Sequence, residues 1–317
     1  MLYGDRSSLS NFDDFDYYEE QNATDSFYNM NASGDDVLYG GDLVAGDLYM
    51  FGGYGNDKLF GGHEAGSSYH KLYGDMKPGS TTANDWYSGL PNDGDDLLDL
   101  GDSDYASGIV NYGYGSGGND KIFGGNASGM QQLHGGNGDD KIWAVNPGQF
   151  QTLGYTGDSI TTQAEGGNGN DIIYGAPHDP SDMYGYEKLF GQFGTLSTTE
   201  DGDDIIYTGD SSSTNAKGDL VYGRGGNDKL YGQGGANHSL YGESGDDLLV
   251  GGEGNDTLWG DDSDSAFEWE ATEGFTLDAS VMIGDDTLYG GEGADMMYGG
   301  HGDDYLYGEE GDDYLYG

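Results

Sequence analysis

Apolar and polar positions alternate along this chain only over short stretches, and glycines bound each stretch. The C-terminal region shows this most clearly, since residues 290–298, 299–307 and 308–316 read GGEGADMMY, GGHGDDYLY and GEEGDDYLY. Each segment fits Gly-Gly-x-Gly-x-Asp-x-U-x, in which U is a large apolar residue. Side chains alternate between the two faces of a strand, so Asp and U lie on the same face. The pattern predicts a glycine-rich turn followed by a short strand in every unit.

The same unit recurs through most of the chain. Further complete copies occupy residues 52–60, 135–143, 166–174, 242–250 and 251–259. Looser copies end at Phe123, Tyr207 and Tyr231, and partial copies lie at 33–39, 92–100 and 283–289. Units that each bury one apolar side chain gain a continuous core only by stacking, so the repetition predicts a solenoid.

Between the complete units lie half-repeats that keep only an apolar residue, then an aromatic residue or His, then Gly. They end at Gly52, Gly74, Gly135, Gly191, Gly223 and Gly242. We interpret each coil as one well-formed turn and one turn expanded by an insertion, which gives about a dozen coils. The main insertions span about 74–91, 99–114, 144–165, 175–187, 208–219 and 260–283, and we expect them on one side of the solenoid.

These repeats resemble the RTX (repeat-in-toxin) calcium-binding nonapeptide family, from about residue 34 to residue 317. The resemblance implies an all-β fold, a right-handed parallel β-roll in which two nonapeptides form one coil. We expect a single domain over 1–317, with 5–33 as an insertion or cap and 34–317 as repeats. Because the pattern is open at both ends, we also expect a segment of a longer protein or end-to-end stacking.

The same resemblance implies several calcium ions held by the repeat aspartates. Glycines permit the positive φ angles of a tight turn, and stacked coils bring carboxylates within about 5 Å of each other. Calcium takes about six to eight oxygen ligands, which carboxylates and turn carbonyls supply. An isolated turn Asp is more simply a solvated residue, but a register of this many favours calcium. The implied metal ligands are Asp36, Asp57, Asp96, Asp120, Asp140, Asp171, Asp204, Asp228, Asp247, Asp256, Asp286, Asp295, Asp304 and Asp313.

The overall charge agrees with a need for cations. The chain has 59 acidic residues against 10 Lys and Arg, which gives a formal net charge of −49. Self-repulsion of this size opposes a compact state, whereas 27 tyrosines argue against permanent disorder. We expect folding to depend on bound counter-ions, and the charge argues against nucleic acid or an anionic membrane as partner. No apolar run approaches the length of about 18 residues needed for a membrane helix.

The last position of the unit points outward and is nearly always aromatic. The residues are Phe60, Phe123, Trp143, Tyr174, Tyr207, Tyr231, Trp259, Tyr289, Tyr298, Tyr307 and Tyr316. We expect them to form one stripe on the outer sheet face. The stripe favours cross-strand stacking, and it can equally be a contact surface for another roll or for carbohydrate.

Enzyme motifs are absent from the sequence: there is no H-E-x-x-H, no G-x-S-x-G and no cysteine. The leading hypothesis is a secreted, extracellular structural protein that forms a filament, surface layer or adhesin and is rigidified by calcium-coupled folding. The alternative is an RTX module that assists secretion and folding of a larger secreted hydrolase or toxin. A polysaccharide-modifying enzyme built on the solenoid is the third hypothesis.

Overall fold

The computed structural model contains strands and no helix among the residues that it describes. These residues are 25–29, 35–40, 47–62, 70–75, 94–101, 110–125, 130–145, 161–176, 188–191, 202–209, 217–261 and 284–317. None of this described part offers a helix suited to crossing a membrane.

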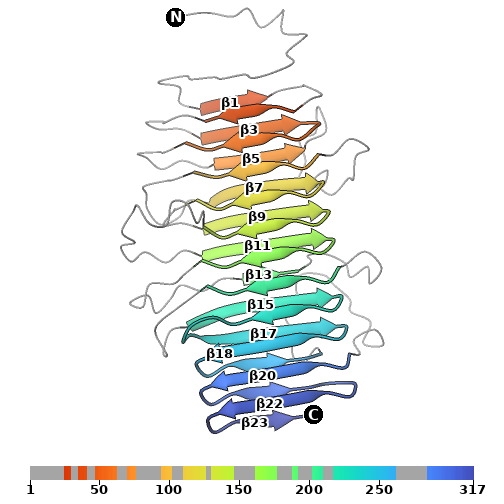
Figure 1. Cartoon of the computed structure of the whole chain (residues 1–317). Helices are drawn as coiled ribbons and strands as arrows, with labels where there is room; N and C mark the ends of the chain where they lie inside the picture. The colour runs from red at the N-terminus through yellow and green to blue at the C-terminus, as the bar shows by residue number, and fades with distance from the viewer. Residues whose placement is uncertain are drawn as a thin grey trace, which may run out of the picture.

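The strands stack into two parallel sheets that run side by side from β1 to β23 (Figure 1). The first sheet holds β1 (Asp25–Asn29), β3 (Asp47–Gly53), β5 (His70–Asp75), β7 (Val110–Gly117), β9 (Met130–Asn137), β11 (Thr161–Asn168), β13 (Lys188–Phe190), β15 (Lys217–Gly225), β17 (Asn237–Ser244), β19 (Thr257–Trp259), β21 (Met296–Tyr298) and β23 (Tyr314–Tyr316). The second sheet holds β2 (Val37–Tyr39), β4 (Lys58–Phe60), β6 (Leu97–Asp99), β8 (Lys121–Phe123), β10 (Lys141–Trp143), β12 (Ile172–Tyr174), β14 (Ile205–Tyr207), β16 (Lys229–Tyr231), β18 (Leu248–Glu253), β20 (Thr287–Glu292) and β22 (Tyr305–Glu310).

Consecutive strands belong to different sheets, so each coil gives one strand to each sheet. Chain order runs odd, even, odd, whereas hydrogen-bonded neighbours are always two strands apart. This is the parallel β-roll that the repeat pattern predicts. We name the turns from the first sheet to the second the first edge, and those from the second sheet to the first the second edge.

The core between the sheets is narrow, and most strands from β2 to β21 give one residue to its centre. The U positions predicted from the repeats fill it, and most are fully buried. Gly113 stands at the core position of β7, and Leu100 fills the space that its missing side chain leaves, since a Cβ on Gly113 would lie 3.0 Å from Leu100 Cδ1. Leu315 was predicted as core but is 44% exposed, because β23 has a neighbouring strand on one side only.

The longer connections lie mainly on the second edge, but not all of them do. Three lie on the first edge, where residues 76–93, 192–201 and 262–283 connect β5 to β6, β13 to β14 and β19 to β20. The predicted clustering on one side therefore describes most insertions, and these three depart from it. Within the predicted insertion or cap at 5–33, residues 25–29 form β1 and pair with β3; residues 1–24 and 30–34 lie outside the described residues.

The outward aromatic residues form two stripes rather than the single one predicted. The second-sheet stripe includes Phe123, Trp143, Tyr174, Tyr207 and Tyr231, whose neighbouring ring centroids lie 4.7–5.3 Å apart. Trp259, Tyr298 and Tyr316 instead belong to the first sheet and stack on each other there. The prediction failed because successive nonapeptides at the C-terminus alternate between sheets, so that their ninth positions face opposite sides of the roll.

Candidate metal sites

All fourteen predicted aspartates lie in turns, immediately before a strand, and the structure divides them between the two edges. Eleven lie on the first edge, each before a second-sheet strand, and run from Asp36 to Asp304. Three lie on the second edge, before β19, β21 and β23: Asp256, Asp295 and Asp313. The repeat pattern predicts a turn before each strand, as the structure has it, but it does not say which aspartates are neighbours in space.

Hydrogen bonds join the eleven first-edge aspartates into one continuous row, which we name the inner ladder. From Asp36 to Asp286, the backbone N–H of each donates to Oδ1 of the aspartate in the next coil, at 2.7–3.1 Å. Asp140, for example, accepts from Asp120 N–H and donates its own N–H to Asp171. Its partners are 20 and 31 residues away along the chain. The ladder thus continues across insertions of different lengths.

A second row runs beside it on the exposed side, formed by the residue before each inner aspartate. From Asn56 to Asp303, each backbone N–H of this outer ladder donates to a side-chain Oδ1 of the preceding coil, at 2.7–3.0 Å. The residues alternate between Asp and Asn over most of the length: Asp35, Asn56, Asp95, Asn119, Asp139, Asn170, Asp203, Asn227, Asp246, Asp285 and Asp303.

The two ladders share one type of hydrogen bond but differ in the residues that make it. Both ladders use the same N–H to Oδ1 bond, and the outer ladder shows that an Asn amide oxygen makes it as well as a carboxylate. The inner ladder nevertheless contains only Asp, although a buried charge costs far more there than an exposed one. The charge or the second oxygen of the inner aspartates therefore serves something besides the hydrogen bond.

The second oxygen, Oδ2, faces other acceptors. In eight of the predicted aspartates Oδ2 is buried and accepts no hydrogen bond within the described residues: Asp57, Asp96, Asp120, Asp140, Asp247, Asp256, Asp286 and Asp295. A Cβ added to Gly135 would lie 2.2 Å from Asp140 Oδ2 and 2.4 Å from the carbonyl oxygen of Gly166 in the next coil. Only glycine fits there, because two oxygens converge on the space that a side chain would take.

Burial makes these carboxylates hard to ionise in the absence of a cation. Burial, with the Asp120 and Asp75 carboxylates, raises the pKa of Asp96 to about 10. Burial also raises the pKa of Asp140 to about 8 and that of Asp57 to about 7. A cation in contact with Oδ2 would reverse this shift, because an opposite charge nearby favours the ionised form.

The donor set fits calcium. It consists of carboxylate and backbone carbonyl oxygens, which calcium prefers, and it includes no sulfur. In the part of the chain that the structure describes, no three acidic or imidazole side chains converge on one point. Calcium at the inner ladder would therefore depend on turn carbonyls, such as that of Gly166, as much as on the aspartates.

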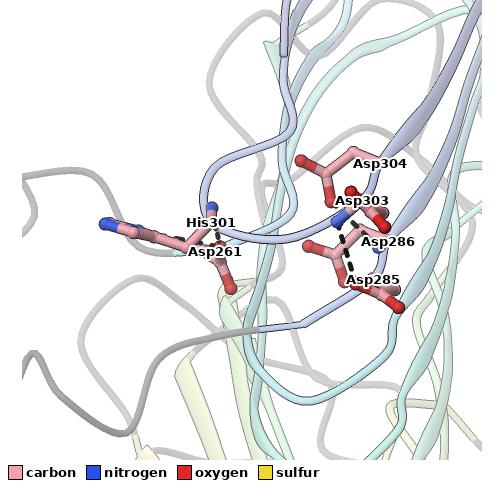
Figure 2. Close-up of polar contacts among 6 residues, drawn as sticks. All are labelled: Asp261, Asp285, Asp286, His301, Asp303 and Asp304. Atoms are coloured by element: carbon pink, nitrogen blue, oxygen red, sulfur yellow. Dashed lines mark hydrogen bonds and ion pairs between the residues drawn. The ribbon is translucent and has the colours of Figure 1, made fainter.

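Two buried acids on the first edge were missed by the sequence interpretation. Asp75 follows Gly74 directly before the longer connection at 76–93, and Asp261 follows Gly260 directly before the one at 262–283; both are buried. Asp75 Oδ2 accepts the N–H of Gly94 at 2.9 Å, and Asp261 accepts the N–H of His301. Figure 2 shows Asp261 with His301 beside the ladder residues of two neighbouring coils. The sequence signal that could have identified them is an Asp directly after the first glycine of the unit, where the repeat has a second glycine.

Comparison with known proteins agrees with this geometry. The family model of the RTX calcium-binding nonapeptide repeat matches residues 49–63, 107–128, 126–144, 157–179, 209–238, 239–264 and 282–317, which together cover just over half of the chain. No curated protein and no solved structure matches the chain significantly.

Proposed function

Since this chain belongs to the RTX calcium-binding nonapeptide-repeat family and binds calcium, we propose that it is a secreted structural protein. Calcium-coupled folding would rigidify it, and it would build an extracellular filament, surface layer or adhesin. The observation that carries the proposal is the inner ladder, which is purely carboxylate from Asp36 to Asp304 and spans eleven coils.

The proposed mechanism follows from charge. At low cytosolic calcium, 59 acidic side chains repel one another, and the inner carboxylates would have to take up protons in order to be buried. Bound calcium supplies the positive charge that lets them stay ionised. At the millimolar calcium outside cells, the turns close and the U positions of successive coils come together, so that folding follows export.

The ligands we propose are the fourteen aspartates of the two edges, together with carbonyls of the turn glycines. Asp140 and its neighbours Asp120 and Asp171 form the central part of this set, because all three stand in units of nine residues and are buried. Asp304 and Asp313 are more exposed than the others. We expect weaker calcium binding at these two positions, since exposed carboxylates interact more weakly with a cation.

Self-association would use the second-sheet stripe. Tyr39 and Tyr307 near its two ends are each 45% exposed and the rings from Phe123 to Tyr231 are half-buried, whereas Tyr73, Tyr114 and Tyr222 on the first sheet are each less than 10% exposed. Asp99 and Val250 divide the stripe into three groups of stacked rings. Partly exposed stacked rings are suited to packing against a second roll, or against the flat face of a sugar.

Negative-stain electron microscopy in millimolar calcium, repeated after chelation, tests the structural role. Fibres or sheets that disperse on chelation are expected. An Asp140→Asn variant should assemble less than the Asp139→Asn variant, which removes the same charge from the exposed outer ladder. Equal far-UV circular dichroism with and without chelator would contradict calcium-coupled folding.

The alternative is an RTX module that assists secretion and folding of a larger secreted hydrolase or toxin. It predicts dispersed single rods at every calcium concentration and a catalytic domain encoded in the same reading frame. We also propose that the chain itself is not catalytic. Incubation with acidic polysaccharides checks this, because unsaturated products or epimerised sugars would reveal an enzyme.

A further inference from the structure

The second edge has a position equivalent to the inner aspartates, but other residues occupy it over most of its length. Strand register aligns Leu48 with His70, Asn111 with Gln131, and Gln131 with Thr162. All are fully buried. These turns therefore lack the carboxylate that the first edge has at the same position.

In the turn after β4, His70 takes the place of the carboxylate. Its Nδ1 lies 2.6 Å from the carbonyl oxygen of Leu100 in the next coil. A carbonyl oxygen only accepts, so Nδ1 carries the proton and donates it. A Cβ on Gly61 would lie 2.3 Å from Leu100 O and 3.2 Å from His70 Nδ1. On the first edge the corresponding pair is Asp Oδ2 and a carbonyl oxygen, two acceptors; here it is a donor and an acceptor.

Gln131 does the same in the turn after β8. Its Nε2 donates to the carbonyl oxygens of Gly125 at 3.0 Å and Ala144 at 3.3 Å, while its Oε1 accepts the N–H of Gly125 at 2.8 Å. Ala144 directly follows Trp143 of β10, just as Gly166 directly follows Glu165 of β11. The carbonyl of Ala144 is therefore the counterpart of the Gly166 carbonyl that faces Asp140. The amide thus pairs with two carbonyl oxygens and one N–H without a cation.

His238 repeats the arrangement in the turn after β16. The N–H of Asp219 donates to its Nδ1 at 3.1 Å, which fixes the proton on Nε2, and Nε2 lies 3.0 Å from the carbonyl oxygen of Gln233. Nδ1 thus replaces the Oδ1 of an inner aspartate, and Nε2–H points at a turn carbonyl. Asp219 has a carboxylate at the same position one coil earlier. Its Oδ2 already accepts the N–H of Gly209 at 3.1 Å, so it does not offer a free acceptor to a cation.

Polar contacts and apolar packing both occur between these turns. Asn111 Oδ1 accepts the N–H of His70 at 3.1 Å, whereas Ala144, Val145 and Ala176 form a small buried cluster of their own at the second edge. The pattern changes after β18. A Cβ on Gly251 would lie 2.5 Å from Gly290 O and 2.7 Å from Asp256 Oδ2, the two-acceptor arrangement of the first edge. The hydrogen bonds from Asp256 to Asp295 and from Asp295 to Asp313 continue it.

We propose that the second edge binds no calcium at the positions of His70, Gln131 and His238, because these side chains place N–H donors against turn carbonyls where the inner aspartates offer only acceptors, and that it binds calcium only from Asp256 to Asp313. This inference rests on the proposed calcium ligands of the first edge. The roll is then calcium-dependent on one edge along most of its length and on both edges at its C-terminal end.

Crystals of the unmodified protein grown in calcium test the proposal directly. Anomalous scattering at long wavelength should place ions along the inner ladder and beside Asp256 and Asp295, with none beside His70, Gln131 or His238. An ion beside any of these three would overturn the proposal. Ions on neither edge would instead overturn the proposed calcium ligands, so the two failures are distinguishable.

A matched pair of variants tests the same point in solution. Gln131→Glu keeps the shape of the side chain but turns the donor into an acceptor, so it should add one bound calcium per chain by equilibrium dialysis. It should also lower the midpoint of thermal unfolding in chelator. Gln132→Glu, the neighbour on the outer face, adds the same charge and should change neither. If Gln131→Glu and Gln132→Glu behave alike in both measurements, the proposal is wrong.

Discussion

Replacing Asp140 with Asn should change stability in opposite directions with and without calcium. Asp140 lies in the middle of the inner ladder, and burial raises its pKa to about 8. Its Oδ1 accepts the N–H of Asp120 at 2.7 Å, a bond that an Asn amide oxygen can also accept. The substitution therefore removes the charge and the Oδ2 acceptor while it leaves the ladder bond in place.

The magnitude follows from the shift in pKa. At pH 7.5 the unfolded chain has a carboxylate with a pKa of about 4, so burying it with a proton costs about 5 kcal/mol. Asn takes up no proton, and its NH2 group would take the place of Oδ2, which faces the carbonyl oxygen of Gly166. The calcium-free fold of Asp140→Asn should thus be up to about 5 kcal/mol more stable. In calcium at about 100 times Kd, loss of one ion should cost about 2.7 kcal/mol.

Urea unfolding followed by far-UV circular dichroism, in chelator and in millimolar calcium, measures both effects. Where the calcium-free chain is largely unfolded, trimethylamine N-oxide added to every sample brings the transition into range. Asp139→Asn is the control, since Asp139 is exposed and the outer ladder carries Asn in neighbouring coils. If Asp140→Asn destabilises the protein equally in chelator and in calcium, the charge argument is refuted.

Three further outcomes are expected. Without calcium, the fold should lose stability as pH rises above about 4, through the raised pKa values of Asp57 and Asp96, because the unfolded chain releases these protons first; acid-induced recovery of circular dichroism in chelator checks this, and a fold that strengthens toward pH 8 would contradict it. Leu230→Ala, at a fully buried core position, should cost about 2–5 kcal/mol in calcium by urea unfolding, and a change below about 1 kcal/mol would mean that the core is loosely packed. Arg224→Ala should cost about 3–5 kcal/mol, because it leaves the buried Glu243 carboxylate without the guanidinium 3.1 Å away; the double variant with Glu243→Gln should recover part of that loss in the same assay.

Much of the fold could be predicted because the information is local. Within one nonapeptide, the Asp and the apolar residue two positions later share a face, and the glycines before them turn the chain. These relations need no knowledge of other coils, and the structure confirms them at Asp140 and Ile142, which are both buried. The count of about a dozen coils follows in the same way, because each complete or half unit contributes one strand.

The sequence by itself determined the repeat, the inward positions and the carboxylates that we propose as calcium ligands, since all three depend on residues within nine positions of one another. Only the tertiary structure decided on which edge each turn lies. The edge depends on whether the strand before the turn is odd or even in chain order, and the insertions make the number of preceding strands hard to count from the sequence. The tertiary structure therefore also decided that Trp259 faces the opposite side from Trp143. The donors of the second edge, such as Gln131, could be recognised only when stacking aligned them with the aspartates of later coils.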